Sequence, residues 1–293
     1  MINTISTYML KNNTALLIIV FCMRLAFSSK VGISFSPAGL LTPFHLGAVY
    51  QLRKCSMIDC EVTLAGSSGG ALAAVTTALN IDEYSSLQSC VEIAKFCREN
   101  GAFASLRGAL DEQMHKILPL DAHKMLNERA GRTLLAYRQI YPSNVPSIVS
   151  FFDSYTDLCD VLRASCTIPV WFSGYPAVKV RDGFGVDGIF AVDFSRFGCP
   201  DTNTNIELLI CPFTVGLTPS STSGKRIDVI SPALLAPEDW PFSSQQLIQL
   251  ALAPPGGRQD ISRATDSAIE NVYSILFSAG RKSVLAWEKG RQH

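Results

Sequence analysis

The chain has 293 residues, with 25 basic and 25 acidic side chains and a formal net charge of zero. This length fits one large α/β domain, alone or with appendages, and a core of that size needs no disulfide bonds. The balanced charge, without long runs of one sign, gives no support to nucleic-acid binding. The sequence also lacks a P-loop, an H-E-x-x-H motif and the cysteine and histidine spacing of a metal site.

The first 29 residues differ in composition from the rest. Lys11 precedes an apolar run at 15–23, and small residues follow it near 26–29. The run is shorter than the roughly 20 residues that cross a bilayer, and the pattern fits a secretory signal. An uncleaved membrane anchor, a mistranslated leader and a bipartite organelle signal are the alternatives. We therefore expect a membrane-associated protein of the secretory pathway or an organelle, with its domain starting at Lys30.

The folded region opens with an apolar strand at 31–36, followed by a loop and a helix. Thr42, which precedes a proline, is a predicted N-cap, and that arrangement is suited to starting a helix. The helix runs to about Cys55 and places its N-terminus beside Gly39, where the helix dipole favours a developing anion. His45, in the first turn, is predicted to have a packing role.

The most informative stretch, at 66–70, fits G-x-S-x-G with Ser68 at its centre. An apolar run leads into it and a run of small residues leads out, which indicates the strand, tight turn and helix of a nucleophile elbow. The flanking glycines Gly66, Gly69 and Gly70 leave room for the turn, and the helix N-terminus beyond them can receive an anion. A plain Gly/Ser turn that enters a helix is the alternative.

If Ser68 is a nucleophile, no later histidine is well placed to activate it. Two lie in charged helical segments and one is the last residue of the chain, where ends fray. These are His115, His123 and His293. The base is therefore predicted to be a carboxylate, whose pKa rises when it loses solvent. Asp187 and Asp182 are the candidates, each followed by glycine, and a β-turn is the alternative for both.

The remaining elements are predicted from periodicity and from capping residues. Helices are expected at 69–79, 81–100, 105–118, 122–130 and 154–165, and strands at 62–65, 133–140, 146–151 and 206–211. This alternation predicts an α/β fold with a mainly parallel sheet and helices on both faces. Sites in such sheets form at the carboxyl ends of strands. Because Gly39, Ser68 and Asp187 each follow a strand end, they are expected to converge there.

Three further features are open to two interpretations. Trp171, Phe172 and Tyr175 either pack in the core or line an acyl pocket. The cysteines outside the leader are predicted to be buried thiols rather than disulfides. Residues 214–293 are expected to form a linker and a helical C-terminal appendage, whose apolar side chains pack against the domain or dock on a membrane.

Several blocks in the chain, in this order, resemble the patatin-like phospholipase family. They are VGISFSPAGLL from Val31 with the helix after it, the elbow at 65–70, ASCTIP from Ala164, and Val186-Asp187-Gly188. Residues 144–158 resemble the animal-type branch that contains adiponutrin and adipose triglyceride lipase. The resemblance covers about Val31 to Phe213, and we therefore expect the patatin-like domain to span 30–213.

The resemblance implies a three-layer patatin-like fold with a Ser–Asp dyad, carried over here to Ser68 and Asp187. It implies hydrolysis of glycerolipid acyl esters (phospholipid, galactolipid or triacylglycerol) through an acyl-enzyme, without metal or organic cofactor. Expected partners are the glycerolipid substrate and a membrane or lipid-droplet surface. The expected oxyanion-hole donors are the N–H groups of Ala38, Gly39, Leu40 and Gly69.

Two positions depart from the family pattern. Pro37 occupies a glycine position in the oxyanion loop and has no N–H to donate. Ile189 stands where the family has Gly or Ala. These departures motivate the alternative of a catalytically weak or inactive lipid-binding protein on the same fold. An acyltransferase that uses the same dyad is a further alternative.

Overall fold

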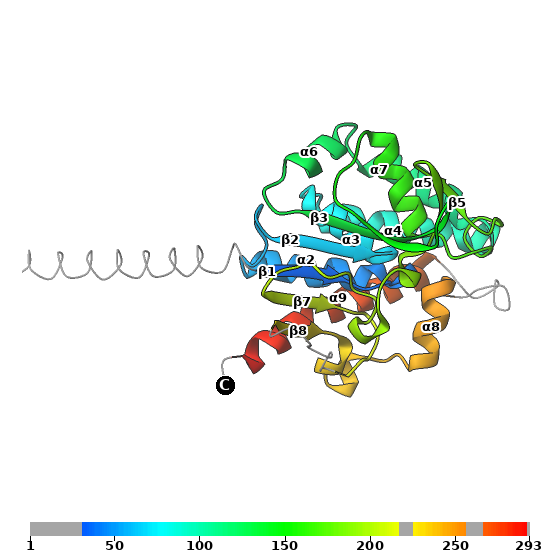
Figure 1. Ribbon diagram of the computed structural model, residues 1–293. Coiled ribbons are helices and arrows are strands. Elements are labelled where there is room, and N and C mark those ends of the chain that lie inside the picture. The colour runs from blue at the N-terminus through cyan, green and yellow to red at the C-terminus, as the bar shows by residue number, and fades with distance from the viewer. Residues whose placement is uncertain (1–30, 217–224, 256–265, 292–293) are drawn as a thin grey trace, which may run out of the picture.

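The computed structural model describes residues 31–216, 225–255 and 266–291. The leader expected at 1–29, the domain start at Lys30 and His293 lie outside the described residues. The described chain is a mixed α/β fold with a mostly parallel central sheet flanked by helices (Figure 1).

The strands and helices alternate through most of the chain. The strands are β1 (Val31–Phe35), β2 (Thr63–Ser67), β3 (Thr133–Tyr141), β4 (Val145–Val149), β5 (Val178–Val180), β6 (Gly183–Val186), β7 (Ile206–Ile210) and β8 (Arg226–Ile230). The α-helices are α2 (Thr42–Lys54), α3 (Gly69–Ala78), α4 (Glu83–Asn100), α5 (Leu106–Ile117), α6 (Ala122–Glu128), α7 (Tyr155–Ser165), α8 (Ser244–Leu252) and α9 (Asp266–Gly290). Short 3-10 helices are η1 (Gly39–Leu41), η2 (Gly188–Phe190), η3 (Phe194–Arg196), η4 (Pro232–Leu234) and η5 (Pro237–Asp239).

The sheet has the order β5-β6-β3-β2-β1-β7-β8, with β4 paired to β3. Strands β3, β2, β1, β7 and β8 run parallel, whereas β4, β5 and β6 pair in antiparallel fashion. Strand β3 is longer than β2, whose last residue Ser67 lies opposite Ala136. Strand β6 pairs with the extension of β3, with Val186 opposite Arg138. The chain that leaves β6 therefore returns to the level at which β2 ends.

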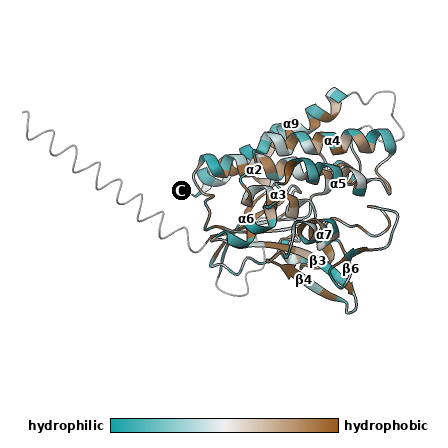
Figure 2. Cartoon of the chain, turned by 90° about the horizontal axis from the view of Figure 1, so that it is seen from above, coloured by the Kyte–Doolittle hydropathy of each residue, from teal (hydrophilic) through white to brown (hydrophobic). Residues whose placement is uncertain are grey.

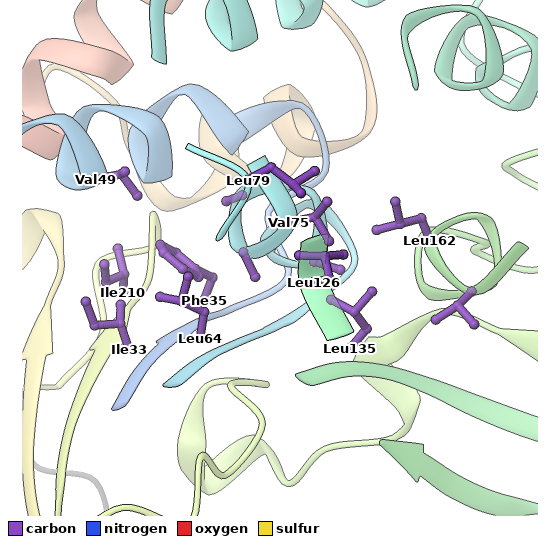
Figure 3. Close-up of a cluster of buried hydrophobic side chains, with 14 of the residues drawn as sticks. Ile33, Phe35, Val49, Leu64, Val75, Leu79, Leu126, Leu135, Leu162 and Ile210 are labelled. Atoms are coloured by element: carbon purple, nitrogen blue, oxygen red, sulfur yellow. The ribbon is translucent and has the colours of Figure 1, made fainter. Parts of the chain in front are cut away.

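One face of the sheet buries large apolar side chains beneath helices. Ile33, Phe35, Leu64 and Ile210 alternate with residues of the other face, as the two-residue period of a strand requires. Figure 3 shows them gathered below α2 and α3. Figure 2 shows α2, α3, α4, α5 and α9 together on one side of the strands. This cluster is the main core of the protein.

The opposite face carries small or polar side chains on β1 and β2 and a smaller apolar cluster of Leu209, Val229 and Cys199, and it is covered by η2, η3 and the coil that follows them. The Ser34 hydroxyl donates to the Pro200 carbonyl at 2.7 Å, and the Ser67 hydroxyl donates to the Gly198 carbonyl at 2.5 Å. The third layer thus consists of 3-10 turns and coil held by hydrogen bonds, because small strand residues let backbone approach the sheet closely.

The described segments at 225–255 and 266–291 pack within the domain, which differs from the appendage expected there. Strand β8, inside the segment expected to be a linker, pairs in parallel with β7. Helix α9 packs along α2, and its Ala279, Val284 and Trp287 belong to the main core. The two helices approach so closely that a Cβ on Gly280 would lie 2.1 Å from the Phe44 carbonyl oxygen. The apolar face of α9 is buried because α2 and the sheet would otherwise be exposed on that side.

Most predicted boundaries are confirmed to within a few residues, with one difference at α2. Thr42 is the first residue of α2 rather than its N-cap, and its hydroxyl donates to the Gly39 carbonyl at 2.8 Å. Gly101 ends α4 with a φ of +79°, as expected of a glycine at that position. All eight cysteines in the described ranges are free thiols. Within those ranges, no helix combines the length and apolar composition that crossing a bilayer requires.

Candidate active site

Ser68 lies on the sharp turn between β2 and α3. Its φ of 54° and ψ of −130° are sparsely populated for a residue with a side chain, which is the strained backbone of a nucleophile elbow. The glycines are sterically required: a Cβ on Gly66 would lie 2.1 Å from the Gly70 carbonyl, and one on Gly70 would lie 2.4 Å from the Ser36 carbonyl. The predicted strand, turn and helix around Ser68 are confirmed as local structure.

Ser165 anchors the turn at Ser68 through hydrogen bonds, and this role was not recognised in the sequence. The Ser68 N–H donates to Ser165 Oγ at 2.9 Å, and the Ser165 hydroxyl donates to the Ala136 carbonyl at 2.7 Å. One buried hydroxyl therefore ties the elbow to β3 and to the end of α7. The only signal was its place in the ASCTIP block, because a serine in the last turn of a helix has no distinctive pattern.

Asp187 faces Ser68 from the end of β6. The Ser68 hydroxyl donates to Asp187 Oδ2 at 2.9 Å, while Oδ1 accepts the Ile189 N–H at 2.9 Å. Asp187 is only 1% exposed. Burial raises its pKa to about 7, against the lowering effect of the bonds from Ile189 and Ser68. Asp182, the other candidate, is exposed on the turn before β6.

The backbone beside Ser68 offers N–H groups to an anion. Gly39, at a φ of +52°, begins η1, and the N–H groups of Gly39 and Leu40 precede the first intrahelical bond of that turn. Gly69 begins α3, and all three residues line the same pocket as Ser68. Ala38, in contrast, packs in a second apolar cluster and does not line that pocket.

The oxyanion loop is supported by a buried histidine. The His45 Nε2–H donates to the Ser36 carbonyl at 3.0 Å. Burial lowers the pKa of His45 to about 4, despite the opposing effect of that bond, so the ring is neutral near pH 7. His115 donates to the Asp111 carbonyl one turn earlier in its own helix. His45 therefore has the packing role expected, and the hydroxyl of Ser68 bonds a carboxylate rather than an imidazole.

A pocket of about 660 Å³, counted with its open mouth, adjoins Ser68. Trp171 and Phe172 line it, which supports the acyl-pocket interpretation for these two residues, whereas Tyr175 is exposed elsewhere. Leu252 of α8 and Tyr273 of α9 complete the wall. Sequence reasoning missed these C-terminal residues because they lie outside every motif. Among the described residues, no group of three or more acidic, cysteine or histidine side chains is arranged to hold a metal.

A serine on a strained strand–helix turn, a buried carboxylate bonded to its hydroxyl, and exposed N–H groups beside it are typical of serine hydrolases on α/β sheets. A sequence model described as patatin-like phospholipase matches residues 33–194, more than half of the chain. The chain therefore belongs to the patatin-like phospholipase family. Membership supports lipid hydrolase activity in general.

Two solved structures are similar to this chain at low sequence identity. VipD from Legionella pneumophila has 9% identity and a TM-score of 0.45, covering 89% of this chain and 67% of VipD. Human GIVD cytosolic phospholipase A2, in complex with methyl gamma-linolenyl fluorophosphonate, has 12% identity and a TM-score of 0.43. That comparison covers 92% of this chain and 60% of the human enzyme. A comparison with curated proteins found no match.

Proposed function

We propose that this protein hydrolyses acyl esters of glycerolipids, with Ser68 as the nucleophile and Asp187 as the general base. The observation that carries the proposal is the 2.9 Å hydrogen bond between Ser68 Oγ and Asp187 Oδ2. It lies beside a pocket whose lining is largely apolar. Because the pKa of Asp187 is raised to about 7, its carboxylate is a much stronger base than an ordinary aspartate.

The reaction follows from these contacts. Asp187 takes the hydroxyl proton as Ser68 Oγ attacks the acyl carbonyl carbon, and the carbonyl oxygen becomes an oxyanion. The N–H groups of Gly39, Leu40 and Gly69 stabilise that oxygen. Collapse expels the alcohol, which takes the proton from Asp187, and leaves Ser68 acylated. Water then attacks the ester carbonyl and loses a proton to Asp187. Collapse breaks the bond to Ser68 Oγ, which takes that proton back from Asp187, and the fatty acid is released.

The Ile189 departure fits an active site, because its backbone N–H holds Asp187 whatever its side chain is. Pro37 supplies no donor, but a Cβ on Gly198 would lie 2.6 Å from its ring, so the proline packs against that turn. The donors then come from the residues after it. Both observations favour hydrolysis over an inactive lipid-binding protein.

The substrate is proposed to be a glycerolipid, met at a membrane or lipid-droplet surface. Phe103 stacks edge-on against Trp171 of the pocket wall and is itself 57% exposed, and Val170, the residue before Trp171, is exposed as well. Exposed apolar side chains next to an acyl pocket are suited to contact with a lipid surface. Residues 144–158, which resemble the adiponutrin and adipose triglyceride lipase branch, support a triacylglycerol or phospholipid substrate. Entry into the secretory pathway or an organelle is part of the same proposal.

Labelling with a fluorophosphonate probe, together with ester hydrolysis, tests the dyad. The folded wild type should be labelled, and Ser68→Ala should be neither labelled nor active. Asp187→Asn should lower kcat/KM by about a thousandfold, within the range for loss of a general base. Asp182→Asn is the matched control, because it makes the same change at an exposed aspartate.

The outcomes separate the alternatives. Unchanged hydrolysis of a nitrophenyl ester by Ser68→Ala would refute the proposal. Folded wild type that resists the probe would instead indicate a lipid-binding protein. Product analysis with triacylglycerol and phosphatidylcholine, in the presence of an added alcohol acceptor, distinguishes hydrolysis from acyl transfer.

A further inference from the structure

The oxyanion loop contacts a turn from a distant part of the chain. Residues 197–200 form this turn between η3 and β7, on the face of the sheet opposite the helices. A Cβ added to Gly198 would lie 2.6 Å from Cδ and 2.9 Å from Cγ of Pro37. Apart from its chain neighbours, no other atom of the described residues lies within 4 Å of that Cβ. The proline ring therefore sets how closely the turn and the loop approach each other.

The same turn also contacts the nucleophile side of the site. The Gly198 carbonyl accepts the hydroxyl of Ser67, the residue before Ser68, at 2.5 Å, and Ser67 is fully buried. The Pro200 carbonyl accepts the Ser34 hydroxyl of β1 at 2.7 Å. The turn is thus bonded both to the strand that leads to the nucleophile and to the strand that leads into the oxyanion loop.

A buried ion pair holds the turn in place. Arg196, at the end of η3, donates from Nη2 to Glu207 Oε2 at 2.7 Å and from Nε to the Cys199 carbonyl at 3.3 Å. Glu207 lies on β7 and is fully buried, and its Oε1 accepts both the N–H and the hydroxyl of Thr202. Both ends of the segment 196–202 are therefore bonded to one carboxylate, on a strand that pairs directly with β1.

We propose that this ion pair positions the oxyanion hole, acting through the contact of Gly198 with Pro37. The proline ring locks φ, so a shift of the turn moves the N–H groups that follow the proline instead of being absorbed by backbone rotation. The ion pair keeps the turn at the one position that fits the ring, which explains how a proline can stand in this loop. The inference rests on the proposed function, because it assigns those N–H groups to the oxyanion.

A double-mutant cycle between Gly198 and Pro37 tests the contact. Gly198→Ala places a methyl group against the proline ring, and Pro37→Gly removes the ring. With Pro37 present, Gly198→Ala should lower kcat for a nitrophenyl ester about tenfold at unchanged KM, a fraction of the roughly 100-fold or greater loss from removing one oxyanion donor. In the Pro37→Gly chain the same change should lower kcat less than about twofold, because the two residues no longer couple. Equal losses in both backgrounds would overturn the inference.

Gly101→Ala is the control for backbone strain. Gly198 has a φ of +75° and Gly101 a φ of +79°, so alanine is strained at both positions. No atom of another segment lies within 4 Å of a Cβ added to Gly101 among the described residues. Gly101→Ala should therefore lower the free energy of unfolding in urea and keep the wild-type kcat. An equal fall in kcat for Gly101→Ala and Gly198→Ala would assign the effect to strain and refute the positioning role.

Variants of the ion pair test its part in the same device. Glu207→Gln keeps the shape of the side chain, but the amide nitrogen cannot accept a hydrogen bond, so one partner of the carboxylate is released. Glu207→Gln and Arg196→Gln should each lower kcat about tenfold at unchanged KM through displaced oxyanion donors. The acid limb of the pH profile should stay in place, because neither residue contributes to the pKa of Asp187. Arg196→Lys, which retains the charge, should recover most of the lost activity.

Glu83→Gln makes the matched change in an ion pair at the other end of α2. Arg53 and Glu83 approach to 2.7 Å and are mostly buried, as are the two residues of the first pair. Glu83→Gln should keep the wild-type kcat. An equal fall in kcat for Glu83→Gln and Glu207→Gln would refute the positioning role, and so would wild-type kcat in both Glu207→Gln and Arg196→Gln.

The activity of the wild type separates this inference from the proposed function. If wild type hydrolyses the ester and Ser68→Ala does not, hydrolysis at Ser68 stands and the cycle alone decides the inference. If wild type neither hydrolyses the ester nor reacts with a fluorophosphonate probe, the proposed function fails and the positioning role fails with it. Urea denaturation of the four proteins of the cycle measures the contact without turnover. The midpoint should fall further for Gly198→Ala when Pro37 is present, and additive midpoints would contradict the contact.

Discussion

Asparagine in place of Asp187 keeps the shape of the side chain and removes its charge. Asparagine Oδ1 can still accept the Ile189 N–H, and its amide can donate to Ser68 Oγ, so both hydrogen-bond positions stay occupied. The substitution therefore isolates the energetic cost of holding a carboxylate in a buried site. We expect the variant to be inactive. The free energy of unfolding of the variant minus that of the wild type should be larger at alkaline pH than at acid pH.

The magnitude follows from the pKa of Asp187. Burial raises it from 3.8 to about 7, so the native protein keeps a proton that the unfolded chain releases between these values. The stabilisation from that proton is complete below the unfolded pKa and is lost as pH rises through the native pKa. Between about pH 5 and about pH 8 the wild type should lose about 2.5 kcal/mol that Asp187→Asn does not lose.

Urea denaturation at several pH values measures this difference directly. The free energy of unfolding of wild type is subtracted from that of Asp187→Asn, so all other titrating groups cancel. Asp182→Asn, at an exposed position, provides the control and should follow the wild type throughout. Parallel curves for wild type and Asp187→Asn would show that the buried carboxyl titrates normally, and the argument for a carboxylate base would fail.

Three further predictions concern the same structure. The pH profile of kcat/KM should rise with unit slope and level off above about pH 7, because only ionised Asp187 accepts the proton; an acid limb below pH 5 would exclude it as the base. Ser165→Ala leaves the Ser68 N–H and the Ala136 carbonyl unpaired, so urea denaturation should show a loss of about 2 kcal/mol and esterase assays a lower kcat. Gly280→Ala should destabilise the protein by about 2 kcal/mol through overpacking against α2. Gly290→Ala should not destabilise the protein, because no atom of another segment lies within 4 Å of the added Cβ among the described residues. Equal stability of the two variants would mean that α9 is not packed as described.

The active-site turn could be predicted from sequence because its signal is local. Gly66, Ser68 and Gly70 lie within five residues, and the steric conflict that requires glycine at position 66 lies within the turn itself, whereas the one at position 70 is with the end of β1. The same holds for Asp187, whose Asp-Gly pair marks the end of β6. The pairing of the two residues needed the family resemblance, because 119 positions separate them and no local pattern links a turn to its partner.

The part of the fold after residue 213 was not predictable from local pattern. Strand β8 follows a Ser/Thr-rich stretch, and the long helix α9 has an apolar face that suits a membrane as well as a protein surface. The apolar face of α9 contacts protein because this helix approaches α2 closely, which the glycines at positions 47 and 280 make possible. A sequence pattern shows that a face is apolar, but it does not show which distant surface will cover it.

Residue type and short-range spacing alone determined that this chain carries a serine on a strained turn, with no histidine suited to activate it. Only the tertiary structure decided that Asp187 is buried against that serine and that C-terminal helices wall the pocket. The physical reason is how far apart in the sequence the interacting residues lie. Turn geometry is set within a few residues, whereas burial, pKa and cavity lining depend on segments that meet only when the chain folds.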